Sequence, residues 1–469
     1  MVHKLYFCKK NITIVSCFLV GRFVNDGNDR IALRATIQIY RAGAWVDAAL
    51  FRVADPRRGI RGSCELEYDV GYAAQFAGPQ STRVAAISCS YPVDFELHQL
   101  PHWPAFLLDV LPNGYGREQW LEQLELADGA AADWPLLLRG TAFPPGNLRI
   151  KQAVEAKVPE RLVPTPEGNL VSMRDHPGFT RSDVLRRTEA FVEYAFQHGI
   201  YAAGASDVQG IAPKLLLVQD SSGRWHAEGA VPDDRVDACW LVKRPRGKGT
   251  FADRKILRNE AAYMTVAQQM GLRVFSPLIW EEDTLFVPRF DRVTSPGSHV
   301  RRYGLESLYS LAGIAEYGSR VSHDRLCDAL LKHSTSPEMD LLEYLKRDIL
   351  NVVLGNKDNH GRNTAVLKNE SGEVQLSPVF DFAPMYLDPE GIARVCRWEG
   401  QAERAAMPDW SAIVGRYADT LGAGRDELRR FGSALQDLPD IAQEAGVDDD
   451  IIAYHLRAID DQARQLMAL

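Results

Sequence analysis

The chain has 469 residues, of which 46% are hydrophobic and 25% charged, which is enough for two or three domains with sizeable cores. Its net charge of −8 excludes a general positive field that would draw the protein onto nucleic acid or anionic lipid. The seven cysteines are scattered and include no CxxC pair, so neither a disulfide scaffold nor a cysteine zinc site is expected, and a cytoplasmic location fits best.

The start of the chain leaves several interpretations open. KKNITIVSCFLV places a short apolar run after two lysines, as in a signal peptide, but the GRFVNDGNDR that follows lacks a small-residue cleavage site. The alternatives are a first β-strand or a misplaced start, so the nature of residues 1–25 stays open. No run reaches the roughly 18–20 apolar residues of a membrane helix, and we expect no membrane partner.

Residues up to about 130 predict short strands followed by helix. The partial alternation over 31–53 predicts two strands joined at the RAG turn, and STRVAAISCSYPV (81–93) predicts another strand. Helical spacing over 103–127 is interrupted at Pro112 to Gly114. The proline-rich stretch 143–169 then predicts a linker or a long loop.

The middle of the chain alternates strands and helices. A helix is expected from Ser182, as its cap, to His198, with Gly199 ending it. A glycine-containing turn and a strand follow in GASDVQGIAPKLLLVQD, and DACWLVKRP predicts a strand that ends on Lys243. NEAAYMTVAQQMGL predicts a helix that Glu260 opens, and TLFVPRFDR predicts the next strand. The remainder is expected to be mostly helical.

A polar stretch, GNKDNHGRN (355–363), directly follows the apolar run LLEYLKRDILNVVL. Gly355 is expected to end the buried helix. Asp358 and Asn363 then show the Asp-x4-Asn spacing of kinase catalytic loops, and Asp381 stands in DFAP where a kinase has DFG. Each fragment alone is weak, because the stretch could also be an Asx-rich turn and Asp381 a turn cap.

The order of these residues suggests phosphoryl transfer, which requires phosphates to be held, their charge neutralised, a metal bridged and a hydroxyl oriented. Lys243 on its strand can neutralise phosphate, and Glu260 can orient Lys243. Asp358 can accept the hydroxyl proton, while Asn363 and Asp381 offer the hard oxygen ligands that Mg²⁺ prefers. A metal-dependent hydrolase is the competing interpretation, but the chain has no HxH or HExxH pattern to support it.

A basic run, LVKRPRGKGTFADRKILR, extends from Leu241 to Arg258. Its clustered lysines and arginines are unusual in an acidic protein. Two interpretations stay open: a solvated loop, or a mobile loop that closes over bound nucleotide.

The motifs resemble those of the HipA family, serine/threonine protein kinases that act as toxins of bacterial toxin–antitoxin modules. GNKDNHGRNTAVL resembles that family's GN-x-D-x-H-x-K-N segment, LSPVFDFAP its L-x-P-x-Y-D segment, and LFVPRFDR its hinge strand. GIAPKLLL resembles the end of its phosphate loop. GSCELEYDVGYA and FLLDVLPNGYGRE resemble its small N-terminal domain, so the resemblance covers most of the chain.

The resemblance implies an α+β, two-lobed protein-kinase-like fold that uses ATP and Mg²⁺. Residues 1–130 would form a small β-rich accessory domain, 131–300 the β-rich N-lobe with linker, phosphate loop and hinge, and 301–469 an all-helical C-lobe. Asp358 would be the catalytic base, Asn363 and Asp381 the metal ligands, and Glu260 the residue that orients Lys243. The residues expected to bind ATP are Lys243, Val208, Gln209, Gly210, Lys214, Val287, Arg289, Phe290 and His360.

The sequence also departs from the family pattern. Asp207 stands where several members carry an autophosphorylated serine, with Ser206 one position earlier as the possible substitute. Gly210 is the one glycine where two are common, and Arg362 stands where lysine is usual. Pro288 replaces a frequent hinge glutamate and removes an N–H donor.

The expected function is therefore a toxin kinase that phosphorylates a translation factor, such as an aminoacyl-tRNA synthetase, and arrests growth. Its expected partner is a helix-turn-helix antitoxin resembling HipB, through which it would reach operator DNA. One alternative is a catalytically weak corepressor that works by contact, which the altered phosphate loop favours. The other is a lipid kinase with the same core.

Overall fold

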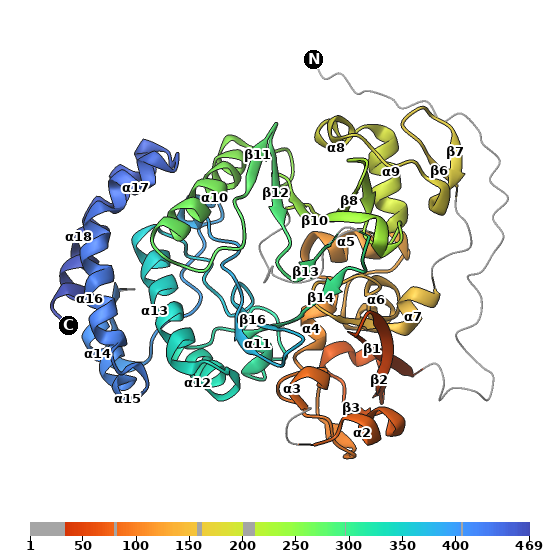
Figure 1. Ribbon diagram of the computed structural model, residues 1–469, viewed down its shortest axis with the longest axis horizontal. Helices are drawn as coiled ribbons and strands as arrows, with labels where there is room; N and C mark the ends of the chain where they lie inside the picture. Colours follow the sequence, from red (N-terminus) through yellow and green to blue (C-terminus); the bar gives the residue numbers. More distant parts are fainter. Residues whose placement is uncertain (1–32, 79–81, 157–161, 200–211, 296, 405–406) are drawn as a thin grey trace.

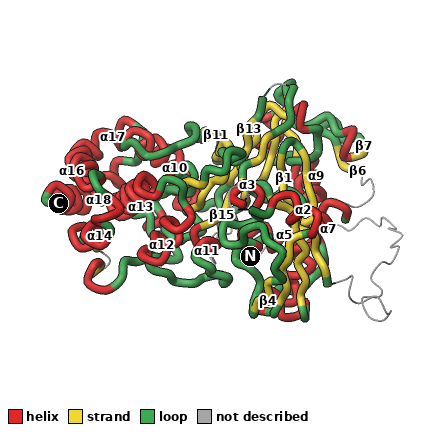
Figure 2. Tube along the Cα trace, turned by 60° about the horizontal axis from the view of Figure 1, so that its bottom comes forward, coloured by secondary structure: helices red, strands yellow, loops and turns green. Residues whose placement is uncertain are grey.

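The computed structural model describes residues 33–78, 82–156, 162–199, 212–295, 297–404 and 407–469. Sheets gather toward the N-terminal half and helices toward the C-terminus (Figure 1), and the same division is visible when the molecule is turned (Figure 2). The fold is therefore a mixture of antiparallel sheets and helices. No helix in these ranges is long and apolar enough to cross a membrane.

The first sheet has the strand order β4-β3-β2-β1-β5. Its β1–β2 hairpin turns at Ala42 and Gly43, both with positive φ, which confirms the predicted RAG turn. One face is buried through alternate residues, among them Ile37 and Ile39, and packs around Trp103. The strands are β1 (Arg34–Arg41), β2 (Ala44–Val53), β3 (Cys64–Tyr68), β4 (His98–Leu100) and β5 (Leu148–Ile150).

Short helices cover this sheet. The predicted interruption at Pro112 to Gly114 is confirmed, because α4 (Leu107–Val110) ends before it and α5 (Gly114–Gln123) begins there. The other helices are α2 (Val70–Phe76), α3 (Thr82–Ala85), α6 (Asp133–Gly140) and α7 (Lys151–Glu155), with 3-10 turns at η1 (Pro56–Arg61) and η2 (Ala130–Ala132).

Two sequence predictions for this region are wrong. The strand expected over 81–93 is α3 followed by an irregular segment, whose backbone is satisfied by tyrosine hydroxyls: Tyr72 donates to the Ala85 carbonyl and Tyr68 accepts from the Ile87 N–H. The stretch 143–169 is no simple linker, because β5 and α7 belong to the first sheet and its core, beyond residue 130. β6 (Leu162–Pro164) and β7 (Leu170–Ser172) form a separate hairpin.

The helix expected over 182–198 is divided into α8 (Arg181–Arg186) and α9 (Glu189–His198). Thr180, not Ser182, caps α8. Arg187 follows α8 with a left-handed φ of 51°, which divides the expected single helix into two. The Val184 and Leu185 carbonyls in the last turn of α8 accept from the guanidinium of Arg244, about 60 positions away, which provides hydrogen-bond donors for the end of the helix. Gly199 does end α9, as predicted.

The second sheet has the order β11-β12-β10-β8-β9 and lies above the first sheet in the view of Figure 1. Its strands are β8 (Lys214–Asp220), β9 (Trp225–Ala227), β10 (Val236–Lys243), β11 (Ile279–Glu281) and β12 (Thr284–Pro288). Smaller elements nearby are η3 (Met173–Asp175), η4 (Asp233–Arg235), β13 (Arg292–Val293) and β14 (Arg301–Arg302).

The long helix beside this sheet, α10 (Phe251–Gln269), begins earlier than expected. Thr250 and Asp253 form a capping box that starts the helix inside the basic run. The interpretation of the whole run as a loop is therefore wrong, since only its segment 244–250 is irregular. Glu260 lies in the middle of α10 instead of opening it, and Gly271 follows the helix end with a φ of 78°.

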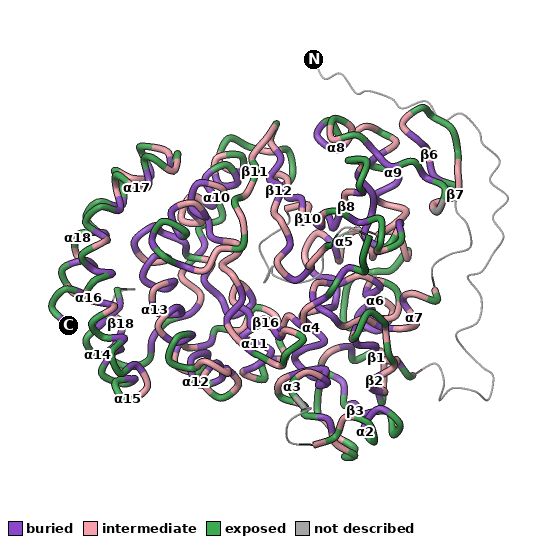
Figure 3. The backbone as a smooth tube through the Cα atoms, viewed as in Figure 1, coloured by how far each residue is buried: buried purple, intermediate pink, exposed green. Residues whose placement is uncertain are grey.

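The C-terminal part is mostly helical and has its own large core, visible as buried segments facing one another in Figure 3. It also contains the sheet β15-β16-β17, so the expectation of an all-helical C-lobe is wrong. The strands are β15 (Gly304–Ser307), β16 (Ala365–Lys368) and β17 (Val374–Leu376), with a small pair β18 (Glu403–Arg404) and β19 (Met407–Pro408). The helices are α11 (Leu308–Leu311), α12 (His323–His333), α13 (Pro337–Val353), α14 (Trp410–Arg416), α15 (Ala418–Leu421), α16 (Gly424–Ala434), α17 (Leu438–Glu444) and α18 (Asp449–Met467), with η5 (Met385–Leu387), η6 (Gly400–Ala402) and η7 (Leu435–Asp437).

Candidate active site

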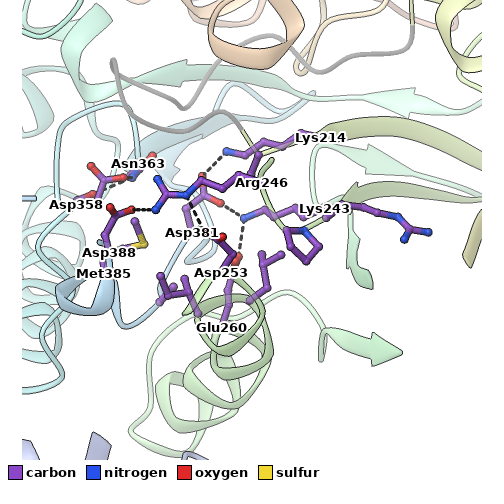
Figure 4. A pocket seen from close by; sticks show the side chains of 16 residues that line it. Lys214, Lys243, Arg246, Asp253, Glu260, Asp358, Asn363, Asp381, Met385 and Asp388 are labelled. Atoms are coloured by element: carbon purple, nitrogen blue, oxygen red, sulfur yellow. Dashed lines mark hydrogen bonds and ion pairs between the residues drawn. The ribbon is translucent and has the colours of Figure 1, made fainter. Parts of the chain in front are cut away.

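Two adjoining pockets lie between the second sheet and the C-terminal part. One is polar (Figure 4) and the other is largely apolar. Both are lined by Lys214, Lys243, Glu260 and Asp381. The polar pocket also includes Asp358 and Asn363, so the residues expected to carry phosphoryl transfer meet at one place although they come from distant parts of the sequence.

Lys243 ends β10, directly opposite Lys214 in the register of the neighbouring strand. Directly opposed residues of antiparallel strands share a face, so both lysines reach the same pocket. The buried Lys243 ammonium donates to Glu260 Oε1 at 2.6 Å and to Asp381. Burial alone would lower the Lys243 pKa, but the two carboxylates outweigh it and raise the pKa above its usual value. Lys243 therefore stays cationic.

Asp381 follows β17 and adopts the left-handed conformation, with a φ of 52° that a non-glycine residue rarely takes. Its neighbour Phe382 packs on Tyr263 of α10, with ring centres 5.1 Å apart, which fixes the turn. Burial alone would raise the Asp381 pKa, but Lys214 and Lys243 together hold it well below its usual range. The carboxylate is therefore ionised at neutral pH, as a ligand for a hard cation must be.

Gly355 ends the buried α13, as predicted. Its φ is 69°, and a Cβ at this position would lie 2.5 Å from the His455 ring, so both conformation and space require glycine. A hydrogen bond to α13 holds the loop that follows, because Asn359 donates to the buried Asp348 of that helix at 3.2 Å. The same carboxylate accepts from Trp398 Nε1 at 2.9 Å, which joins the loop to a more distant segment.

Asp358 and Asn363 face each other across this loop. Asn363 Nδ2 donates to the Asp358 backbone carbonyl at 2.8 Å and lies 3.5 Å from Asp358 Oδ2. With the amide nitrogen used in this way, Asn363 Oδ1 is buried and has no hydrogen-bond partner in the described ranges. An orphaned amide oxygen beside the Asp358 and Asp381 carboxylates is a donor set that fits Mg²⁺. Among the described residues, no cluster of three or more histidine, cysteine or acidic side chains could hold a metal ion.

His360 is fully buried and lines neither pocket. Its Nδ1 accepts from the Arg362 N–H at 3.2 Å, so the neutral ring carries its proton on Nε2, which lies 3.4 Å from Asp358 Oδ1. The structure thus places His360 behind Asp358, and its contact with a nucleotide stays a prediction.

Val287, Arg289 and Phe290 line the apolar pocket, as expected of a hinge. The Arg289 side chain is not directed at a ligand, because it is buried in ion pairs with Glu228 and Asp291. Its backbone N–H donates to the Cys239 carbonyl at 3.0 Å. Since Pro288 has no N–H, two successive hinge positions offer no free donor.

The predicted phosphate-loop residues Ser206, Val208, Gln209 and Gly210 lie outside the described residues and stay predictions; of that group only Lys214 is described, at the start of β8. Arg246, which is not among the predicted site residues, also lines the polar pocket and pairs with Asp253 at 2.7 Å and Asp388 at 3.1 Å. It belongs to the basic run 241–258, but no spacing rule distinguishes it from the other arginines there.

Comparisons with known proteins show which proteins the chain is similar to. The family model described as HipA-like C-terminal domain matches residues 206–452. A Sinorhizobium fredii (strain NBRC 101917 / NGR234) protein named "Putative kinase Y4mE" is 28% identical over 79% of this chain and 84% of its own length. A second protein of that strain, "Putative kinase Y4dM", is 22% identical over 43% of this chain and 52% of its own.

The fold resembles that of a HipA chain of Shewanella oneidensis MR-1, solved as a toxin–antitoxin complex of HipA, HipB and its operator DNA. The TM-score is 0.55 with 17% sequence identity, over 92% of this chain and 96% of that one. Because the family model spans more than half of the sequence, the chain belongs to the family of proteins with a HipA-like C-terminal domain.

Proposed function

We propose that the protein is a kinase that transfers the γ-phosphoryl group of ATP to a serine or threonine hydroxyl of another protein. One observation carries the proposal: Lys243, Glu260 and Asp381 are assembled in the same pocket as Asp358 and Asn363 (Figure 4). Phosphoryl transfer depends chiefly on positioning and electrostatic stabilisation, and this set supplies both. The adjoining apolar pocket beside Val287 is suited to a purine.

The residues divide the work by charge. Lys243, oriented by Glu260, and Lys214 neutralise phosphate oxygens. Asn363 and Asp381 would hold Mg²⁺, which supplies charge neutralisation to the phosphates when bound. Asp358, whose side chain is 25% exposed, accepts the hydrogen of the substrate hydroxyl and directs its oxygen.

The family and the solved HipA structure support a proposal for the biological role. We propose that the kinase is the toxin of a toxin–antitoxin module in the cytoplasm. A helix-turn-helix antitoxin would silence it and link it to operator DNA. A translation factor such as an aminoacyl-tRNA synthetase would be its substrate, so that phosphorylation arrests growth.

The test incubates purified protein with γ-labelled ATP, Mg²⁺ and a cell lysate, beside D358N and the matched control D419N. Asp419 is an exposed carboxylate on α15, remote from the pockets. Labelled protein bands in the wild type and D419N that vanish in D358N support the kinase. Absence of transfer would overturn it in favour of a contact-dependent corepressor, and label in lipid would favour a lipid kinase. Growth arrest on expression that D358N relieves tests the toxin role.

A further inference from the structure

A buried ion pair joins the first sheet's helices to the catalytic loop. Asp109 lies in α4, and Arg362 lies between His360 and Asn363. Arg362 Nη1 donates to Asp109 Oδ1 at 2.9 Å, and the arginine side chain is 1% exposed. A charge-assisted hydrogen bond in such a dry environment is strong and directional.

Both members of the pair are held by further contacts. Asp109 also accepts from the Ser307 N–H at 2.9 Å and from the Ser307 hydroxyl at 2.7 Å. The Arg362 guanidinium lies 4.9 Å from the centre of the Tyr317 ring. The Tyr317 hydroxyl in turn donates to the Leu108 carbonyl at 3.3 Å, so the α4 segment contacts this region twice.

The contacts continue from Arg362 to Asp358. The Arg362 N–H donates to His360 Nδ1, and His360 Nε2 faces Asp358 Oδ1. The Asn363 N–H donates to the His360 carbonyl at 3.0 Å. Between them Gly361 is so close to Tyr309 that a Cβ would lie 2.2 Å from its ring. The loop from 360 to 363 therefore has little freedom to shift without moving Asp358 or Asn363.

We propose that Asp109 is a positioning residue for the catalytic loop, so that the N-terminal part of the chain completes the active site through the Asp109–Arg362 pair. The effect on rate rests on the proposed kinase function. The simpler alternative is that the pair only holds two parts of the molecule together. Ser88 provides the matched control, because its hydroxyl donates to Glu306 at 2.6 Å in another buried contact between the same two parts that includes neither Asp109 nor a residue of the loop.

The test compares wild type, D109N, R362M, the double variant D109N/R362M and S88A. Steady-state kinetics give kcat and the KM for ATP, and hydrogen-exchange mass spectrometry follows the amides of residues 356–364. D109N removes the carboxylate charge that faces the buried Arg362 cation. We expect kcat to fall at least tenfold in D109N, the KM for ATP to change less than twofold, and exchange over 356–364 to rise. The KM is spared because Lys243, Lys214 and the hinge lie on other elements.

R362M removes the same ion pair by changing its partner in the catalytic loop. It tests the positioning role of the pair if D109N does not fold. The double variant should lose no more kcat than the stronger single variant, since both remove one interaction. S88A should keep at least half of the wild-type kcat. Unchanged exchange over 356–364, or a kcat loss no larger than that of S88A, would overturn the proposal. If the wild type transfers no phosphate, the proposed function fails, and the exchange data alone decide the positioning role.

Discussion

Replacing Lys243 by methionine should destabilise the fold in a pH-dependent way. Lys243 is 4% exposed and is the cation between the buried carboxylates of Glu260 and Asp381. Methionine keeps much of the volume but leaves the two carboxylates facing each other, with only Lys214 still paired to Asp381, at 3.4 Å. Breaking a buried ion pair by removing one partner costs about 3–5 kcal/mol of unfolding free energy at pH 7.

The sign of the pH dependence follows from Asp381. Its pKa in the wild-type fold is lowered, so its contribution to stability is present above the unfolded pKa of about 3.9 and is lost as pH falls below that value. Without Lys243 the lowering is weaker, and one carboxylate of the pair binds a proton more readily. The stability difference between wild type and K243M should therefore be largest near pH 7 and shrink toward pH 4.

Urea titrations at pH 7, 5 and 4, followed by tryptophan fluorescence, measure this difference. The matched control is K151M, because Lys151 of α7 pairs with Asp47 at 2.8 Å and the two side chains are 38% and 43% exposed. An exposed pair of this kind contributes about 0–1 kcal/mol. A K243M destabilisation no larger than that of K151M, or a difference independent of pH, would refute the assignment of Lys243 as a buried, doubly paired cation.

Three further predictions concern the loop, the cation and the core. G355A should lower the unfolding free energy by about 1–3 kcal/mol, because the Gly355 backbone is left-handed and an added Cβ would meet His455. Thermal or urea unfolding measures this loss. The control for the steric part is G391A, where the φ is similar and an added Cβ meets nothing within 4 Å. Chelation of Mg²⁺ should abolish phosphate transfer. N363A should raise the Mg²⁺ concentration that transfer requires. An equal dependence of the rate on Mg²⁺ concentration in N363A and wild type would exclude Asn363 as a ligand. Burial lowers the His323 pKa from 6.5 to about 4, so its stabilisation is fully present above pH 6.5 and is lost as pH falls toward 4. Between pH 7 and 5 the wild type should lose roughly 2 kcal/mol more than H323Q, and equal slopes would count against a neutral buried His323.

Much of the site was predictable because its chemistry is ordered along the chain. A lysine at a strand end, a glutamate in the next helix and the Asp358-x4-Asn363 spacing are local patterns, and Asp381 follows in a recognisable tetrapeptide. The start of α10 was missed for an equally local reason, since Thr250 and Asp253 form a capping box that the surrounding lysines and arginines obscured.

What the sequence could not predict depends on pairs far apart in it. Arg244 donates to carbonyls at the end of α8, about 60 residues upstream, and Arg362 pairs with Asp109 at a separation of 253 residues. A lone arginine or aspartate carries no signal of its partner. The strand expected over 81–93 failed similarly, because the apolar residues there are buried in irregular backbone that the hydroxyls of Tyr68 and Tyr72 satisfy.

The contacts of Arg289 with distant residues would also limit how the proposed nucleotide is bound at the expected hinge. Glu228 and Asp291 hold the Arg289 side chain, and Cys239 accepts its N–H, so Arg289 is fixed by the fold and not by a ligand. Pro288 supplies no donor. An adenine in the apolar pocket would therefore have to obtain its hydrogen-bond donor from another hinge position or bind chiefly by burial. Under the proposed binding of ATP, the exocyclic amine of adenine would have to donate to a carbonyl of this segment, and specificity for adenine over guanine would rest on that contact and on the shape of the pocket.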